Sequence, residues 1–93
     1  MTQLTQIGTH ATVVLQVEDH TSIIYRGTKV VRFNNNEIVL NTDGWQTSTT
    51  KRRMNQASGQ FGLGYHVYQD KGIWYVDYKD KTLEFSDNMI LCR

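Results

Sequence analysis

The amino-acid sequence predicts a small α+β domain in which a single helix packs on antiparallel β-sheet. The first observation is one convincing helical pattern, which lies between hydroxyl residues at 47–49 and glycines at 62 and 64. The second is that segments rich in β-branched and aromatic residues lie on both sides of this pattern, separated by turns with Asn, Asp or Gly. One helix among hairpins is typical of a two-layer domain. A small OB-like barrel, which also holds one helix between its strands, is the alternative.

Several strands are predicted on the N-terminal side of the helix. Residues 1–10 are polar, and we expect them to form a loose arm or to lead into the first strand. That strand, Ala11–Glu18, is rich in β-branched residues and places Val13, Leu15 and Val17 on one side. The strands that follow it, each after a short turn, are Ser22–Arg26, Thr28–Phe33 and Glu37–Asn41.

The segment Thr28–Phe33 shows a regular alternation. Because successive strand residues point to opposite faces of a sheet, Val31 and Phe33 are expected on one face and Val30 on the other. The run Asn34–Asn36 is predicted to be the hairpin turn after this strand, since Asn tolerates positive φ.

The helix has recognisable ends and one apolar stripe. Thr47, Ser48 and Thr49 are candidate N-caps, because a hydroxyl can accept a hydrogen bond from a free N–H group of the first turn. Gly62 or Gly64 can supply the left-handed residue that ends the helix. Such a short helix is marginal alone in water, so its stripe must pack on a sheet. The residues of the stripe are Thr50, Met54, Ala57 and Phe61.

More strands are predicted after the helix. The tripeptide Asp70-Lys71-Gly72 is typical of a three-residue hairpin loop with Gly in the left-handed conformation. Leu83 and Phe85 alternate in a later strand and are expected to point inward. The predicted strands are Tyr65–Gln69, Ile73–Lys79, Thr82–Ser86 and Met89–Cys92.

Length and composition restrict the class of protein. The 93 residues form one domain, and the formal charge of +1 provides no global field that would attract nucleic acid. A single cysteine, Cys92, excludes an internal disulfide and fits a reducing compartment. No apolar run approaches the length of a membrane span, and no secretory signal is visible, so we expect a cytoplasmic protein that does not bind a membrane.

The first candidate site is a basic cluster, Lys51, Arg52 and Arg53, in the predicted first turn of the helix. The helix dipole disfavours cations there, whereas the free N–H groups favour an anion, so the cluster predicts a site for phosphate. Gln56 and Trp45 are expected to contribute to the same site. The alternative interpretation is that the cations are solvated or pair with carboxylates nearby in the fold.

The second candidate site is the aromatic hairpin, with Tyr68, Trp74, Tyr75 and Tyr78 as the residues expected to bind a partner. Trp74 and Tyr78 share one face of the predicted strand and Tyr75 lies on the other, so one face must be core and the other partly exposed. Packing within the core is the alternative role for any one of these rings.

Nothing in the sequence predicts an enzyme, a cofactor or a metal site. His10, His20 and His66 have no spacing typical of metal ligands, either with each other or with the cysteine. There is no nucleophile elbow and no recognisable Ser/His/Asp order. We therefore expect a protein that acts by binding.

A specific motif runs through the predicted helix and into the hairpin after it. Residues 44–55 read GWQTSTTKRRMN, and Phe61-Gly62-Leu63 and the pair Gln69 and Trp74 follow. This arrangement resembles a family of small tailed-bacteriophage proteins that share a GW-x-T-x-TTK-x-RMN segment, FGL and a Gln-x-x-x-Trp hairpin. Gln69 and Trp74 are one residue further apart here. The resemblance covers roughly residues 30 to 91 and implies action inside a bacterial host, but it implies no specific activity.

Three functions are compatible with these observations. The leading hypothesis is a phage-type protein that binds nucleic acid or a host nucleoprotein complex through the basic end of the helix. The second is an inhibitor of a host enzyme or defence system, of the anti-CRISPR kind, that uses the aromatic hairpin. The third is a structural or assembly protein that forms a homodimer through an edge strand such as Met89–Cys92.

Overall fold

The computed structural model describes residues 11–93, and the arm predicted for residues 1–10 lies outside this range. The order of elements is β-β-β-β-α-β-β-β-β, which confirms the predicted succession of strands and helix. The elements are β1 (Thr12–Val17), β2 (His20–Tyr25), β3 (Thr28–Phe33), β4 (Glu37–Leu40), α1 (Ser48–Phe61), β5 (Tyr65–Asp70), β6 (Ile73–Tyr78), β7 (Lys81–Glu84) and β8 (Met89–Cys92).

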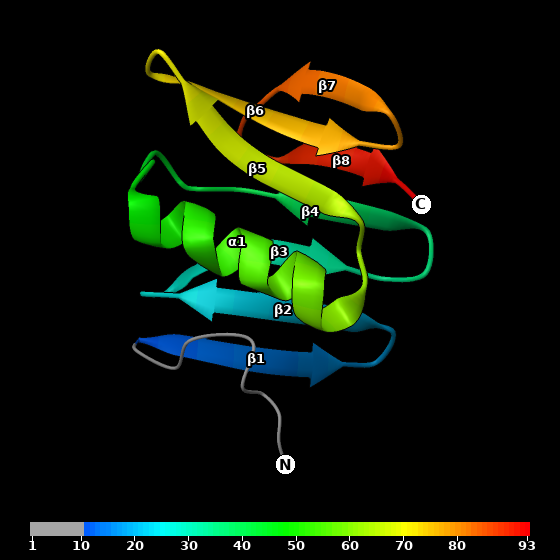
Figure 1. Ribbon diagram of the computed structural model, residues 1–93. Coiled ribbons are helices and arrows are strands. Elements are labelled where there is room, and N and C mark those ends of the chain that lie inside the picture. Colours follow the sequence, from blue (N-terminus) through cyan, green and yellow to red (C-terminus); the bar gives the residue numbers. More distant parts are fainter. Residues whose placement is uncertain (1–10) are drawn as a thin grey trace.

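The strands form two antiparallel sheets, one five-stranded in the order β1-β2-β3-β4-β8 and one three-stranded in the order β5-β6-β7. Helix α1 lies across one face of the larger sheet, and β5 runs beside the helix (Figure 1). The predicted α+β class is therefore confirmed. The OB-like alternative is wrong, because β1 and β8 are opposite edges of an open sheet and do not close a barrel.

A bulge in β3 changes the predicted alternation. The pairing of β2 with β3 shifts between Ile23, which lies opposite Val31, and Ile24, which lies opposite Lys29. The extra residue, Val30, is 1% exposed and Val31 is fully buried. The expectation that these two valines lie on opposite faces is therefore wrong, because an unpaired residue interrupts the period of two.

Both ends of the helix lie at residues that the sequence predicts. Among the candidate caps, Thr47 is the N-cap, and its side chain accepts a hydrogen bond from the Thr50 N–H. Gly62 ends the helix in the left-handed conformation, with φ 65° and ψ 39°. The N–H of Leu63 then donates to the Ser58 carbonyl at 2.9 Å. Both ends thus satisfy backbone groups that a helix terminus leaves unpaired.

The core lies between α1 and the larger sheet and continues under the smaller sheet. Met54 and Ala57 are fully buried, as the stripe predicted, and Phe61 lies at the margin with its ring centroid 5.1 Å from that of Phe33. Leu83 is an exception to the predicted inward set, because it is 36% exposed. The other buried apolar residues are Ile23, Tyr25, Val30, Val31, Ile38, Leu40, Leu63, Tyr65, Val67, Trp74, Val76, Phe85 and Leu91.

Two polar side chains of α1 bind the backbone of β5. The Asn55 amide donates to the Val67 carbonyl at 2.8 Å and accepts from the Val67 N–H at 2.7 Å. The Ser58 hydroxyl donates to the Tyr65 carbonyl at 2.7 Å and accepts from the Tyr65 N–H at 3.0 Å. The helix therefore covers the edge of β5 that no strand pairs with among residues 11–93.

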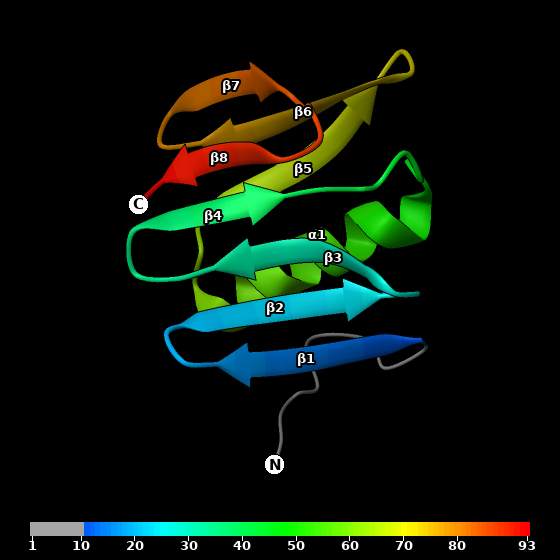
Figure 2. The same cartoon turned by 180° about the vertical axis from the view of Figure 1, so that it is seen from behind.

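The opposite face of the five-stranded sheet is not covered by any element among residues 11–93 (Figure 2). Val13, Leu15 and Val17 of β1 share this face, as predicted, and they are 56%, 43% and 52% exposed. At the far edge of the same sheet, Ile90 of β8 is 57% exposed. The large sheet is thus buried on one side only.

Candidate functional site at the N-terminal end of α1

The loop that leads into α1 is held by a carboxylate from the other end of the chain. Asp87 accepts hydrogen bonds from the backbone N–H and the hydroxyl of Thr42, both at 2.7 Å. It also accepts from the Gly44 N–H at 3.3 Å. The turn requires positive φ at Asp43 (53°) and Gly44 (83°), and glycine adopts such values without steric cost. This anchored turn positions Trp45 beside the start of the helix.

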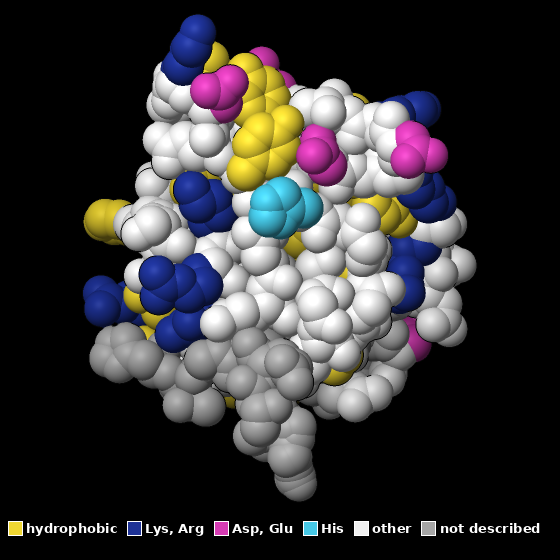
Figure 3. Space-filling view, in the orientation of Figure 1, with side chains coloured by type: hydrophobic (Ala, Val, Ile, Leu, Met, Phe, Trp, Pro, Cys, Tyr) yellow, Lys and Arg dark blue, Asp and Glu magenta, His cyan; other side chains and the backbone are white. Residues whose placement is uncertain are grey.

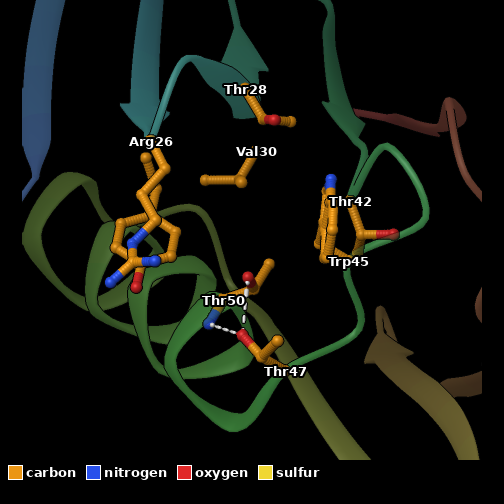
Figure 4. A pocket seen from close by; sticks show the side chains of 8 residues that line it. Arg26, Thr28, Val30, Thr42, Trp45, Thr47 and Thr50 are labelled. Carbon is orange, nitrogen blue, oxygen red and sulfur yellow. Dashed lines mark hydrogen bonds between the residues drawn. The ribbon is translucent and has the colours of Figure 1, made fainter.

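A pocket of about 290 Å³ lies at this end of the helix, between the β2–β3 turn and the anchored loop. Figure 4 shows Trp45 on one side of it, Arg26 on the opposite side, and Thr47 and Thr50 below. The two threonine hydroxyls are 3.0 Å apart and hydrogen-bond to each other. The lining residues are Tyr25, Arg26, Thr28, Val30, Thr42, Trp45, Thr47 and Thr50.

The walls of this pocket differ in exposure. Trp45 is 68% exposed, whereas Tyr25 is buried. The guanidinium carbon of Arg26 lies 5.6 Å from the centroid of the Tyr25 ring, within the range of a cation–π contact. An exposed indole beside a cation held over a second ring is a suitable surface for a planar, negatively charged ligand.

The predicted basic cluster separates into exposed and buried members. Lys51 and Arg52 line a shallow hollow on the outer side of the helix, together with Ser48, Asn55 and Gln56. Arg52 is exposed, and Lys51 is half-buried with its Nζ 5.6 Å from the ring centroid of Trp74. The hollow adjoins the first turn of α1, which holds no acidic residue.

Arg53 has a different position from its two neighbours. It is 7% exposed, and its Nε donates to the Thr12 hydroxyl at 3.0 Å. Its Nη1 donates to the Gln56 side chain at 3.1 Å, and its guanidinium carbon lies 5.7 Å from the centroid of the Tyr25 ring. Arg53 therefore connects α1 to β1 and β2, and it is buried rather than exposed beside Lys51 and Arg52 as a predicted phosphate contact.

Within residues 11–93, Lys51 and Arg52 form no ion pair with an acidic side chain. The ion pair found among residues 11–93 joins His20 and Asp19, at 2.9 Å, and involves neither Lys51 nor Arg52. On the space-filling surface, Lys and Arg side chains gather at the N-terminal end of the helix (Figure 3). The alternative expectation, pairing of the cluster with nearby carboxylates, does not occur among the described residues. We call Arg26, Trp45, Lys51 and Arg52 the basic surface.

The sequence did not single out Arg26 for this surface. It follows β2 in the tight turn before β3 and has φ 50°, a left-handed value. The dipeptide Arg26-Gly27 marks a turn tip, which is the signal that could have drawn attention to it. Only the packing of the β2–β3 turn next to α1 reveals that it shares a pocket with Trp45.

The aromatic hairpin is divided between core and surface. Trp74 is 4% exposed, and its ring lies 5.5 Å from that of Phe85 in an edge-on contact. Tyr78 is half-buried, with its hydroxyl 3.1 Å from the Cys92 carbonyl. Tyr68 and Tyr75 are also half-buried but lie on the outer face, with stacked ring centroids 5.7 Å apart. The predicted division into a core face and an exposed face is therefore real, and Trp74 belongs to the core face.

The outer face of the small sheet carries a row of rings with acids beside them. His66 stacks on Tyr68 at a centroid distance of 6.0 Å, and Tyr68 stacks on Tyr75. Carboxylates lie beside the rings at the top of Figure 3. By register, Asp77 is opposite His66 and Glu84 is opposite Tyr75. We call this ring row with its acids the acidic aromatic face.

One buried tyrosine lies between the helix and β5. The Tyr65 hydroxyl donates to the Met54 carbonyl at 2.5 Å. Burial raises the pKa of the Tyr65 hydroxyl well above its usual range, because a phenolate would lose its hydration there. Tyr65 therefore remains a neutral hydrogen-bond donor, and its surroundings indicate a structural role.

Among residues 11–93, no group of three or more His, Cys, Asp or Glu side chains is arranged to hold a metal ion. Within the same range, no helix is long and apolar enough to cross a membrane.

Comparison with known families places the chain among bacteriophage proteins. Residues 2–92 match the model of the family described as Kyanoviridae Gp96 protein. Because the match spans nearly the whole sequence, the chain belongs to this family, whose activity is unknown. The phage origin predicted from the GW-x-T-x-TTK-x-RMN motif is thereby confirmed. Neither the curated proteins nor the solved structures gave a match.

Proposed function

We propose that this member of the Kyanoviridae Gp96 family is a non-enzymatic binding protein that engages nucleic acid through the basic surface at the N-terminal end of α1. The observation that carries the proposal is an indole, Trp45, that is 68% exposed beside cations without a carboxylate partner among residues 11–93. An exposed aromatic ring beside cations is the arrangement on which a base of a single strand stacks, and such stacking would cover the indole.

The parts of the surface have separate roles in this proposal. Arg26 and Arg52 supply charge for phosphates, and each phosphate contact releases bound counterions from the nucleic acid. Trp45 supplies a stacking platform that tolerates any base. The pocket between Trp45 and Arg26, of about 290 Å³, accommodates a small planar group rather than a duplex. The proposed ligand is therefore a single strand, free or displayed by a host nucleoprotein complex.

The test is binding of short fluorescent single- and double-stranded DNA and RNA at low and moderate salt. We expect single strands to bind, with affinity that falls by roughly one log unit per log unit of salt for each phosphate contacted. Trp45→Ala should weaken binding with little change in this salt slope, whereas Arg26→Ala/Arg52→Ala should weaken binding and reduce the slope. Arg53 should remain intact in all variants, because its guanidinium bonds inside the fold.

A matched control uses exposed cations elsewhere on the chain. Lys79 and Lys81 lie beside β8 in a different hollow, so Lys79→Ala/Lys81→Ala removes the same charge away from the basic surface. We expect this control to bind almost as the wild type does. Equal loss in both double variants would indicate only nonspecific attraction, and absence of binding at low salt would reject the proposal.

A second candidate function rests on the acidic aromatic face. The stacked Tyr68 and Tyr75 with Asp77 and Glu84 nearby fit a basic protein surface better than a phosphate backbone. Such a surface would serve an inhibitor of a host nucleic-acid-binding enzyme. This function would be favoured if the chain captured a host protein and if Tyr75→Ala, but not Trp45→Ala, abolished the capture. Tyr75 is the ring to replace, because Trp74 is buried in the core.

A further inference from the structure

The outer edge of strand β1 is not paired with any strand among residues 11–93. Every residue of the strand after Thr12 is exposed, and the sequence TVVLQV contains no charged residue and no proline. On the uncovered face of the sheet, Val13, Leu15 and Val17 are 56%, 43% and 52% exposed. On the other face, Val14 is 46% exposed. An apolar edge strand without protecting charges is a template for another strand.

The backbone of β1 is available for such pairing. The Arg26 N–H donates to the Ala11 carbonyl at 2.9 Å, which makes this pair a hydrogen-bonded one. In an antiparallel ladder the hydrogen-bonded pairs alternate, so Val13 and Leu15 bond to β2 while the N–H and C=O groups of Val14 and Gln16 point away from it. No strand among residues 11–93 lies on that side of β1.

The other sheet edges are less suited to self-pairing. Asn55 and Ser58 cover the edge of β5. The edge strand β7 is four residues long and carries Lys81 and Glu84, charged side chains of the kind that protect an edge. β8, the strand suggested from the sequence for a homodimer, lines a hollow with Lys79 and Lys81, so a second copy there would bring like charges together.

We infer that β1 pairs antiparallel with β1 of a second copy of this chain, so that two five-stranded sheets become one continuous sheet. Side chains directly opposite each other must share a face, which allows Leu15 to lie opposite Leu15 of the second copy. In this register, Val13 of each copy lies opposite Val17 of the other copy. The exposed aliphatic side chains of both copies then form a single cluster, and no charged residue of β1 meets its like.

The charges that flank β1 support a second copy as the occupant. Glu18 follows the strand, and Asp19 beside it has a side chain that is 74% exposed. Arg26 lies at the other end of the strand, paired with Ala11. Antiparallel self-pairing with Leu15 at the centre places Glu18 opposite Thr12 of the second copy, at the same end of that strand as its Arg26, which lies one strand further in. Each acidic end meets a basic end, so the surface is complementary to itself.

The arrangement has a consequence for binding. A two-fold axis at Leu15 would run perpendicular to the continuous sheet, so both copies of α1 would lie on the same side of it. Two basic surfaces would then face one ligand, which raises avidity without new contacts. The dimer itself does not depend on the proposed nucleic-acid function, because its strand pairing is made by β1, and of the basic surface only Arg26 lies close to the pairing.

Sedimentation equilibrium of the full chain over a wide micromolar range tests the inference. We expect a species of twice the monomer mass of 10.8 kDa at high concentration. Leu15→Lys should raise the dimer dissociation constant about tenfold or more, because two ammonium groups would meet at the axis. Val14→Pro should have a similar effect, since it removes an outward N–H without breaking the β1–β2 ladder.

Ile90→Lys is the matched control, because Ile90 is 57% exposed on the same sheet face but lies on the opposite edge strand. It should leave the dimer intact, and circular dichroism should show all variants folded. A wild-type chain that stays monomeric overturns the inference and leaves β1 to a strand of another protein. A dimer that survives both β1 substitutions, or that Ile90→Lys disrupts equally, also overturns it.

Discussion

The edge strands β5 and β1 differ in whether the helix bonds to the backbone groups at their outer edges. Both present backbone groups that no strand pairs with among residues 11–93. At β5, the helix supplies Asn55 and Ser58, which bond both backbone groups of Val67 and of Tyr65. At β1, the Arg53 guanidinium donates to the Thr12 hydroxyl, and no strand among residues 11–93 pairs with the outer edge. The covered edge belongs to the folded core, whereas the outer edge of β1 is the one for which we propose an interaction.

This difference explains part of the family motif. In the RMN segment, Arg53 bonds to Thr12, Met54 is fully buried and Asn55 bonds to the backbone of β5. Thr47 in the same motif caps the helix. These residues therefore hold the helix between the sheets. The motif that suggested a binding site from sequence is in large part a structural motif, and Lys51, which is half-buried, is its member on the basic surface.

The largest expected effect comes from Asn55→Asp, which breaks the covered edge without changing the size of the side chain. The carboxylate would face the Val67 carbonyl, now 2.8 Å from the Asn55 amide nitrogen, and would lose a donor. We expect a loss of about 3 kcal/mol in the free energy of unfolding at neutral pH. Urea denaturation at several pH values measures it. The loss should shrink at acidic pH, where a protonated carboxyl can donate again, and a constant loss would contradict this explanation.

Ser58→Ala should have the next largest effect, because it removes both hydrogen bonds to Tyr65. We expect a loss of about 1–2 kcal/mol, since two buried backbone groups lose partners while alanine favours the helix. Urea denaturation measures the loss. The control is Gly59→Ala, which also introduces alanine into the helix but at an exposed position without these hydrogen bonds. A neutral result would mean that the Tyr65 backbone finds another partner.

Tyr65→Phe tests the third contact at the covered edge, the hydrogen bond from the hydroxyl to the Met54 carbonyl. We expect a loss of about 1 kcal/mol at neutral pH. The folded state holds the proton of Tyr65 more tightly than the unfolded state, so wild-type stability should fall as pH rises above about 10. Chemical denaturation from neutral to alkaline pH should show a weaker fall in Tyr65→Phe than in the half-buried control Tyr68→Phe.

The smallest expected effect is on the open edge. Val13 is 56% exposed, and Val13→Thr keeps a β-branched residue in the strand. At concentrations where the chain is monomeric, we expect the free energy of unfolding to change by less than about 0.5 kcal/mol. A loss as large as that of Ser58→Ala, measured in the same urea titration, would show that β1 is as much a part of the core as β5.

Interactions between residues close in the sequence were sufficient to predict the helix and the strands. The hydroxyl of Thr47 and the left-handed Gly62 delimit the helix because capping depends on neighbours within a few residues. The helical stripe with Met54 and Ala57 is buried as its period predicts. The hairpins between strands likewise follow from turn residues, so the order of elements and the α+β class could be read from the sequence.

Only the tertiary structure shows which residues of the candidate sites are exposed and which are buried. Arg52 and Arg53 are adjacent and chemically alike, yet only Arg52 is exposed, because Arg53 faces β1 and β2. Trp74 lies in the core and Tyr75 on the surface, a choice that the period of two leaves open.

What the sequence by itself determined about this protein is the identity and order of its elements, its class and its phage family. What only the tertiary structure decided is which faces and edges are covered. Arg26 and Trp45 line one pocket from distant segments, Asn55 covers the edge of β5, and the outer edge of β1 pairs with no strand among residues 11–93. The physical reason is range: capping and turn preferences act between near neighbours, whereas burial depends on which segments far apart in the chain pack together.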